Sequence, residues 1–145
     1  MSGHSHFAES VEEYLEAIYR LEREGPGVST SGLATQLGVA PASVSGMLRK
    51  LERDGFLELV ARGEVKLTEK GLRYGQNVLR RHRLAERLLT DVLKMPLAEV
   101  HQEACMLEHA ISPRVEERLM ALLGSPTTCP HGNPIPPPPE RLEDT

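Results

Sequence analysis

Four side chains of types that bind transition metals lie close together in the stretch HQEACMLEHA, residues 101–110. They are His101, Cys105, Glu108 and His109. An α-helix turns by about 100° per residue, so these four would share an arc of roughly 100°, while Glu103 would point away. Imidazole, thiolate and carboxylate groups are ligands of divalent transition metals. A helix with one small core cysteine and surface charges has the same spacing, so both interpretations stay open here.

A second pair of such residues, His82 and Glu86, stands four positions apart in RRHRLAERLL. Residues at this spacing share one helix face, where they commonly form only a solvated pair. The metal-binding residue types at 101–110 strengthen the interpretation of His82 and Glu86 as metal ligands. Cys129 and His131 are of suitable types too, but we interpret His131 as structural and do not expect a zinc site there.

Composition predicts that helices position these residues. The chain of 145 residues is 39% apolar, with no Trp, three Tyr and two Phe, so its core must be aliphatic. Such a composition favours a mostly α fold, with one core or two small modules. The pattern predicts helices at about 10–24, 68–93, 96–110 and 112–123, followed by a proline-rich segment.

The stretch VSTSGLATQLGVAPASVSGMLRKLERDG, residues 28–55, has the pattern of a helix-turn-helix. Ser29 or Thr30 can cap a first helix, GVA forms the turn, and Pro41 suits the start of a second helix that runs to Asp54. FLELV and EVKLT then alternate apolar and polar residues around ARG, which predicts a hairpin. The two motifs together predict a winged helix.

Charge supports DNA binding by this part of the chain. Net charge is -4, but residues 41–87 carry 11 Lys or Arg against 6 Asp or Glu, between acidic flanks. In a winged helix the second helix of the motif enters the major groove. A winged helix used for protein contacts is the alternative, and the basic region disfavours it.

The candidate DNA-contacting residues fall into two groups. Small residues that let the helix backbone approach the bases are Ala40, Ala42, Ser43, Ser45 and Gly46. Candidates for phosphate contact are Thr30, Ser31, Lys50, Arg53 and Arg62. Because few side chains of this set can read bases directly, we expect a symmetric dimer on two half-sites, with the helical C-terminal half as the dimerisation unit.

Several blocks together resemble the diphtheria toxin repressor family of iron- and manganese-dependent transcriptional regulators. They are EEYLEAIYRLEREG, SVSGMLRKLERDGFL, LTEKG, RRHRLAERLLTDVL, VHQEACMLEHAIS and PHGNPIP, in order from about residue 10 to 136. The resemblance implies a homodimeric repressor that binds double-stranded operator DNA when metal is bound. It predicts a winged-helix domain at 1–70, a dimerisation and metal-binding domain at 71–126 and a proline-rich tail or linker at 127–145.

The resemblance also assigns two metal sites per subunit. His82, Glu86 and His101 match one site. Cys105, Glu108 and His109 match the other, which takes a further ligand from the first helix at Glu13 and, in manganese-sensing members, an acid where Glu16 stands. Iron-sensing members have methionine at the position of Glu13, and the best-known manganese type has a carboxylate at that of Cys105, so this chain departs from both patterns.

Ligand hardness favours Mn(II) over Fe(II), because up to four carboxylates and three imidazoles stand against one sulfur. Co(II), Ni(II), Zn(II) and Cd(II) are expected to bind in vitro, since divalent affinity generally rises towards the later metals.

Other classes fit less well. An enzyme is not expected, because no HExxH motif or nucleophile arrangement accompanies the ligands. A winged-helix regulator that senses oxidation through Cys105 is the alternative function. The chain has no run of about 18 apolar residues and no signal peptide, so we expect a cytoplasmic protein without membrane contact.

Overall fold

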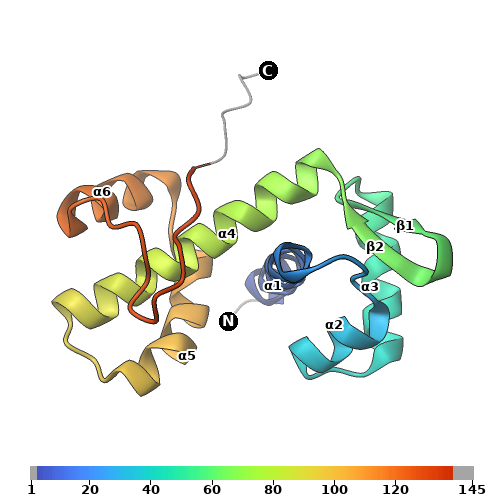
Figure 1. Ribbon diagram of the computed structural model, residues 1–145, viewed down its shortest axis with the longest axis horizontal. Coiled ribbons are helices and arrows are strands. Elements are labelled where there is room, and N and C mark those ends of the chain that lie inside the picture. The colour runs from blue at the N-terminus through green and yellow to red at the C-terminus, as the bar shows by residue number, and fades with distance from the viewer. Residues whose placement is uncertain (1–2, 139–145) are drawn as a thin grey trace. The chain divides into compact units, whose positions relative to one another are not determined.

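The computed structural model describes the backbone of residues 3–138 and the side chains of residues 11–138. The chain divides into two compact units, Met1–Gln76 and Asn77–Thr145, and each is described by itself. The described backbone contains six α-helices and one two-stranded sheet (Figure 1). The predicted mostly α class is therefore confirmed. The predicted boundaries at 1–70, 71–126 and 127–145 remain predictions.

The first unit is a winged helix-turn-helix. It contains α1 (Gly3–Glu24), α2 (Thr30–Leu37), α3 (Pro41–Arg53), β1 (Leu57–Val60), β2 (Glu64–Leu67) and the first turns of α4 (Glu69–Arg87). Apolar side chains from the three leading helices and the hairpin form its core. The most deeply buried of them are Leu15, Ile18, Leu33, Val44, Leu48, Leu51 and Leu57.

Local signals at the helix-turn-helix act as predicted. The Ser29 hydroxyl accepts a hydrogen bond from the Gly32 N–H at 3.0 Å and so caps α2. Gly38, with φ of 70°, ends that helix in a left-handed conformation that glycine adopts without strain. Pro41 is the first residue of α3, where a missing N–H costs nothing.

The predicted hairpin is confirmed as an antiparallel pair. Leu57 pairs with Leu67 and Val60 with Glu64, and a tight turn of Ala61–Gly63 joins the strands. Arg62 at the tip has φ of 66° and is exposed. Leu57, Val65 and Leu67 are buried, so one face of the hairpin packs on the unit and the tip is left in solvent.

The first helix is longer than predicted. Helix α1 begins at Gly3, whereas the sequence pattern placed its start near residue 10. Residues 3–10 contain no proline and no apolar periodicity, so the pattern could neither extend the helix there nor stop it.

The second unit contains the rest of α4, α5 (Leu97–Leu107), a short 3-10 turn (Glu108–Ala110) and α6 (Pro113–Leu123). Ser112 caps α6 by accepting a hydrogen bond from the Val115 N–H, and Pro113 follows it, as predicted. The core residues of this unit are Ala85, Leu89, Val100, Ala104, Ile111 and Leu119. No helix in the described part of the chain is long and apolar enough to cross a membrane.

The end of the long helix differs from the prediction. The sequence pattern predicted α-helix up to Leu93, but the α-helical part ends at Arg87 and a π-helical turn (Leu88–Val92) follows. The Leu93 N–H donates to the Leu88 carbonyl, one residue further back than in an α-helix. Lys94 then takes a left-handed conformation, with φ of 58°, and the chain turns toward Pro96.

Close packing of α4 within the first unit depends on two glycines. A Cβ atom added to Gly75 would lie 2.6 Å from the Leu15 carbonyl oxygen of α1 and 2.9 Å from Cβ of Tyr19. A Cβ on Gly71 would meet the Phe56 carbonyl oxygen. Both contacts involve backbone, which cannot move aside as a flexible side chain can. The helix backbones therefore approach each other only because no side chain intervenes.

We predict that Gly75→Ala lowers the free energy of unfolding by about 1–3 kcal/mol, because the added methyl group overpacks the contact with α1. Gly46→Ala is the matched control, since a Cβ there meets nothing within 4 Å and alanine favours a helix interior. Urea unfolding followed by circular dichroism measures both variants. A Gly75→Ala variant as stable as the unmodified protein would contradict the close approach.

Candidate metal centre

His82 on α4 lies between two buried carboxylates. Its Nε2 is 3.1 Å from Oε2 of Glu86, one turn further along α4, and its Nδ1 is 2.6 Å from Oε1 of Glu108 in the turn after α5. Each of the three side chains belongs to a residue that is only 2% exposed. A neutral imidazole has a single N–H, so it can donate to only one of the two carboxylates. The other oxygen then faces an unprotonated nitrogen, unless the ring is protonated or a cation lies between them.

Helix α5 adds His101 and Cys105 beside the row formed by Glu86, His82 and Glu108. Nδ1 of His101 is 3.5 Å from Oε2 of Glu86, and its Nε2 is 3.7 Å from Sγ of Cys105. Ligand atoms of His82, His101 and Cys105 all lie within 4.8 Å of one another. The His101 side chain is 54% exposed, so this side of the cluster is open to solvent. The predicted helical spacing therefore does bring His101 and Cys105 to one place.

His109 lies on the far side of Glu108. Its Nε2 is 3.4 Å from Oε2 of Glu108, and the two atoms form no hydrogen bond. Among the described residues nothing donates a hydrogen bond to Oε2 of Glu108, although that oxygen is buried. A buried carboxylate oxygen without a donor is costly, and a bound cation would remove the cost. The donor set and this oxygen fit a divalent metal.

Cys129 and His131 were left out of the sequence-predicted site, yet they lie beside Glu86. Nδ1 of His131 is 3.4 Å from Oε1 of Glu86, and the ligand atoms of Glu86, Cys129 and His131 lie within 4.8 Å of one another. Cys129 is 1% exposed. The Cys-x-His spacing was the only local signal for this group, and it could not show that the segment returns to α4.

Arginines of α4 hold that segment in place. Arg87 donates to the carbonyls of Thr128 and Cys129, Arg83 to that of Pro134, and Arg80 to that of Pro136. The carbonyls of a proline-rich segment have few backbone N–H partners nearby, so guanidinium donors take their place. The bonds fix Cys129 and His131 next to Glu86.

The neighbours of Glu86 lower its pKa. Burial alone would raise that pKa, but hydrogen bonds from His82 and Cys129, together with charge on His82 and His131, outweigh burial and bring the pKa to about 2. Glu86 is therefore a carboxylate near neutral pH, which is the form that binds a metal.

The other two predicted ligands, Glu13 and Glu16, belong to α1 and hence to the first unit. Glu13 is exposed, whereas Glu16 is 7% exposed. Glu16 accepts a hydrogen bond from Arg20, one turn later, at 2.9 Å. Arg20 therefore offsets part of the Glu16 charge.

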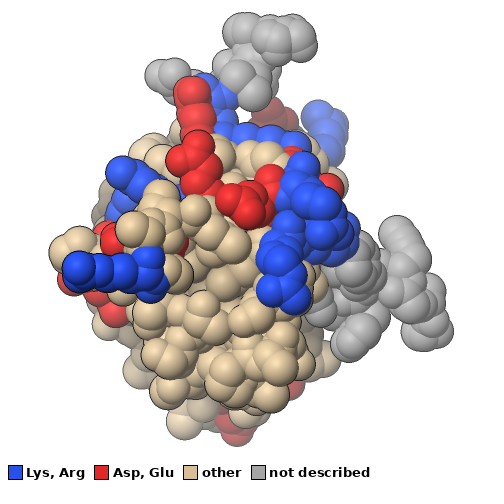
Figure 2. Space-filling model, turned by 90° about the vertical axis from the view of Figure 1, so that its right-hand side faces the viewer, with Lys and Arg blue, Asp and Glu red and all other residues tan. Residues whose placement is uncertain are grey.

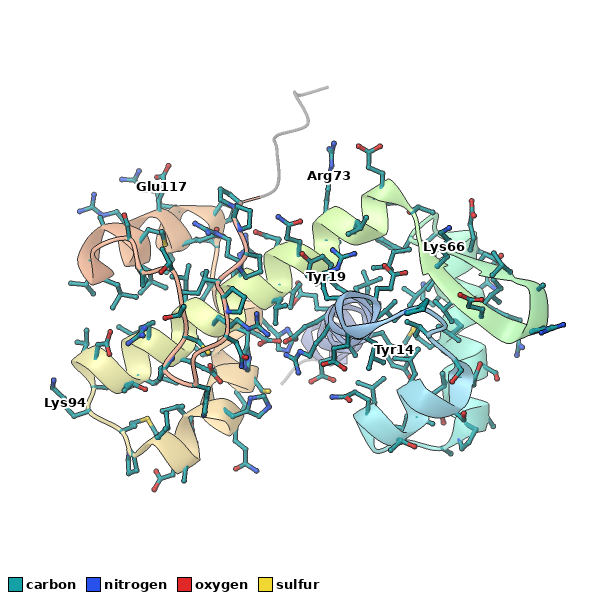
Figure 3. The ribbon with its side chains drawn as sticks, in the orientation of Figure 1. Tyr14, Tyr19, Lys66, Arg73, Lys94 and Glu117 are labelled. Atoms are coloured by element: carbon teal, nitrogen blue, oxygen red, sulfur yellow. The ribbon has the colours of Figure 1, made fainter. Side chains whose placement is uncertain are left out.

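The predicted DNA-contacting residues lie on α2, α3 and the hairpin tip. Most of them are exposed, and Thr30, Ser45 and Lys50 are half-buried. Lys50 forms an ion pair with Asp54 at 3.1 Å. Figure 2 shows this face with Lys and Arg at both sides, Asp and Glu between them in the upper part and uncharged residues below. Sequence reasoning left out two further exposed cations, Arg49 on α3 and Lys66 on β2 (Figure 3).

Comparison with known proteins places the chain in a family. A family model described as the N-terminal DNA-binding domain of iron-dependent repressors matches residues 6–65. A second, described as the metal-binding and dimerisation domain of iron-dependent repressors, matches residues 68–137. Together the two models cover most of the chain.

Individual relatives agree with the family models. The iron-dependent repressor IdeR of Mycobacterium tuberculosis is 46% identical over 128 residues, covering 88% of this chain and 56% of the relative. The diphtheria toxin repressor of Corynebacterium diphtheriae is 39% identical over 128 residues, covering 88% and 57%. A solved structure described as a manganese-dependent transcriptional repressor in complex with manganese is similar, with a TM-score of 0.82 at 40% identity, over 88% of this chain and 58% of that one.

The chain thus spans a little more than half the length of these relatives. Its winged helix-turn-helix coincides with the first family model, and its buried row of carboxylates and imidazoles lies within the second. The predicted resemblance is confirmed, and the chain belongs to the iron-dependent repressor family of transcriptional regulators.

Proposed function

We propose that this protein is a metal-activated repressor that binds double-stranded operator DNA as a homodimer and so controls metal homeostasis. The observation that carries the proposal is His82 between Glu86 and Glu108, with further imidazole and thiol groups around them. Two buried carboxylates on one imidazole leave excess negative charge in a site of low dielectric, which favours a divalent cation.

We assign two sites per subunit. His82, Glu86 and His101 would hold one metal, with Cys129 and His131 beside Glu86 as additional ligands. Cys105, Glu108 and His109 would hold the other, together with Glu13 and Glu16 by resemblance to the family. Sγ of Cys105 lies 3.7 Å from Nε2 of His101, so its place in the second site rests on resemblance to the family and not on this contact.

Mn(II) is the proposed physiological metal, with Fe(II) next. Carboxylate and imidazole ligands dominate the set and suit a hard cation, whereas the Cys105 thiolate pulls toward softer metals. The relatives differ in the same respect, since some are named iron-dependent and another manganese-dependent. Co(II), Ni(II), Zn(II) and Cd(II) should bind in vitro, because divalent affinity generally rises towards the later metals.

The mechanism is thermodynamic linkage between metal and DNA. Glu86 and Glu108 would hold the cation, whose positive charge would neutralise these carboxylates and so stabilise one arrangement of α4 and α5. The small residues at the start of α3 let its backbone approach base edges, while Arg53 and Arg62 contact phosphates. Metal would raise DNA affinity to the extent that the DNA-competent arrangement binds metal more tightly than the other arrangement does. The protein would act in the cytoplasm, would be no enzyme and would need no membrane.

The sharpest test titrates operator binding against Mn(II), Fe(II), Co(II) and Zn(II), with metal-free protein as reference. We predict that metal raises operator affinity by roughly 5- to 150-fold, the usual range for coupling between two sites. Fluorescence anisotropy of labelled operator DNA measures the effect. Operator binding that is indifferent to every metal would refute the proposed function.

Glu108→Gln tests the buried row. We predict at least a tenfold loss of metal affinity in calorimetry, because the amide keeps the shape of Glu108 but removes its charge. The metal-free variant should be no less stable than the unmodified protein, since the substitution removes a buried charge. Glu103→Gln is the matched control on an exposed position of α5. Equal metal affinities for the two variants would contradict the assignment.

Cys105→Ser tests the role of sulfur. We predict that this variant keeps metal-dependent operator binding but binds Co(II) and Zn(II) less tightly relative to Mn(II), because a soft ligand is replaced by a hard one. A weaker sulfur-to-cobalt absorption band in the Co(II) protein would identify the Cys105 thiolate, and any band that remains would come from Cys129. Unchanged metal preference together with a lost response to peroxide would instead support oxidation sensing.

A further inference from the structure

Carboxylates hold the outer edges of the wing, here defined as Leu57–Leu67. Its two strands pair only with each other within the described residues, so each strand has outward N–H groups without a strand partner. The Leu67 N–H on β2 donates to Oε2 of Glu22 at 2.9 Å. The Leu59 N–H on β1 donates to Oε2 of Glu52 at 3.1 Å.

Glu22 connects the wing to α1. It lies in the last turn of that helix, and its side chain is 18% exposed. Beside it, the Val65 N–H of β2 donates to the Val28 carbonyl in the loop after α1, at 2.9 Å. Glu22 and Val28 therefore bond the outer edge of β2 at two successive outward N–H groups, as a third strand would. Figure 1 shows this loop running from the end of α1 past β2.

Glu52 connects the wing to α3, the helix that we expect to enter the major groove. It lies in the last turn of α3, seven residues before Leu59. One strand of the wing is thus bonded to α3 and the other to α1. A charged acceptor makes each of these hydrogen bonds stronger than a bond between neutral groups.

The wing needs such support because it is small. An isolated two-stranded hairpin is marginally stable in water, and each of these strands has only four residues. The exposed cations Arg62 and Lys66 belong to this hairpin. Their position relative to α3 depends on what fixes the strands that carry them.

We propose that Glu22 and Glu52 are positioning residues for operator recognition. Their carboxylates fix the wing against α1 and α3, so that Arg62 and Lys66 meet DNA phosphates at a set distance from α3. Because α1 also carries Glu13 and Glu16, Glu22 passes a displacement of α1 directly to the wing. The inference rests on the proposed function for its DNA step, whereas the hydrogen bonds are testable without DNA.

The experiment compares Glu22→Ala and Glu22→Gln in the full chain, with Glu24→Ala as matched control. Glu24 is an exposed acid near the end of the same helix, so its removal changes net charge equally without touching the wing. The glutamine variant keeps an oxygen that can accept the Leu67 hydrogen bond.

Amide hydrogen exchange in the metal-free protein is the first readout. We expect Glu22→Ala to exchange the Leu67 amide roughly tenfold or more faster, because its charged acceptor is lost. Amides in the middle of α3 should stay unchanged, and Glu22→Gln should restore most of the Leu67 protection. Unchanged exchange at Leu67 in Glu22→Ala would overturn the positioning role.

Operator affinity across a salt series, with Mn(II) present, is the second readout. We expect Glu22→Ala to bind about tenfold more weakly, with a salt slope smaller by about 1 for each wing phosphate contact that is lost. Metal affinity should not change. Glu24→Ala should bind as tightly as the unmodified protein or slightly more tightly, since it removes a charge that repels DNA.

Outcomes separate the two proposals. If Glu22→Gln binds no better than Glu22→Ala, or if both lose affinity with an unchanged salt slope, Glu22 does not position the wing. If the unmodified protein fails to bind operator DNA with any metal, the proposed function fails, while exchange at Leu67 still decides whether Glu22 holds the wing. Glu52→Ala and Glu52→Gln repeat the test at Leu59.

Discussion

Burial of charge at the row formed by Glu86, His82 and Glu108 is the constraint on which the second unit depends. One imidazole cannot donate to two carboxylates unless it is protonated, and desolvation makes an uncompensated carboxylate costly. Helix α4 supplies two members of the row, and the turn after α5 supplies the third. The aliphatic core beside them holds α4 and α5 together, so the charged groups cannot separate to relieve their repulsion. A divalent cation would resolve this conflict, and under the proposed function the row would sense the metal as well as bind it.

Helix α4 also organises the chain that follows α6. Its arginines bind carbonyls of residues 128–136, and Arg80 and Arg81 additionally pair with Glu116 of α6. Proline residues supply no N–H groups, so the segment's own N–H groups satisfy only some of its carbonyls, among them those of Thr127, Cys129 and Asn133. The arginines both solve that problem and deliver Cys129 and His131 to Glu86. The position of the segment and the proposed metal ligands therefore rely on the same helix.

In the first unit, backbone contacts do much of the positioning. Glycines at 71 and 75 permit close approach of α4 to its neighbours, and carboxylates at 22 and 52 bond the free edges of the wing. Neither feature needs a large apolar surface. A small winged helix-turn-helix can thus keep its exposed side polar while its hairpin stays in place.

Sequence alone determined most elements and local groupings: a cap at Ser29 or Thr30, the cap at Ser112, the hairpin, and the shared helix faces of His82 with Glu86 and of His101 with Cys105. These follow from spacing, because helix and strand periods are local properties. Tertiary structure decided which residues far apart in the chain contact each other, because sequence spacing predicts only local neighbours. It brought Glu108 onto His82, returned Cys129 and His131 to Glu86, and replaced the last α-helical turn of the long helix by a π-helical one. Such contacts join residues far apart in the chain, and they depend on how packed elements satisfy buried charges and carbonyls together.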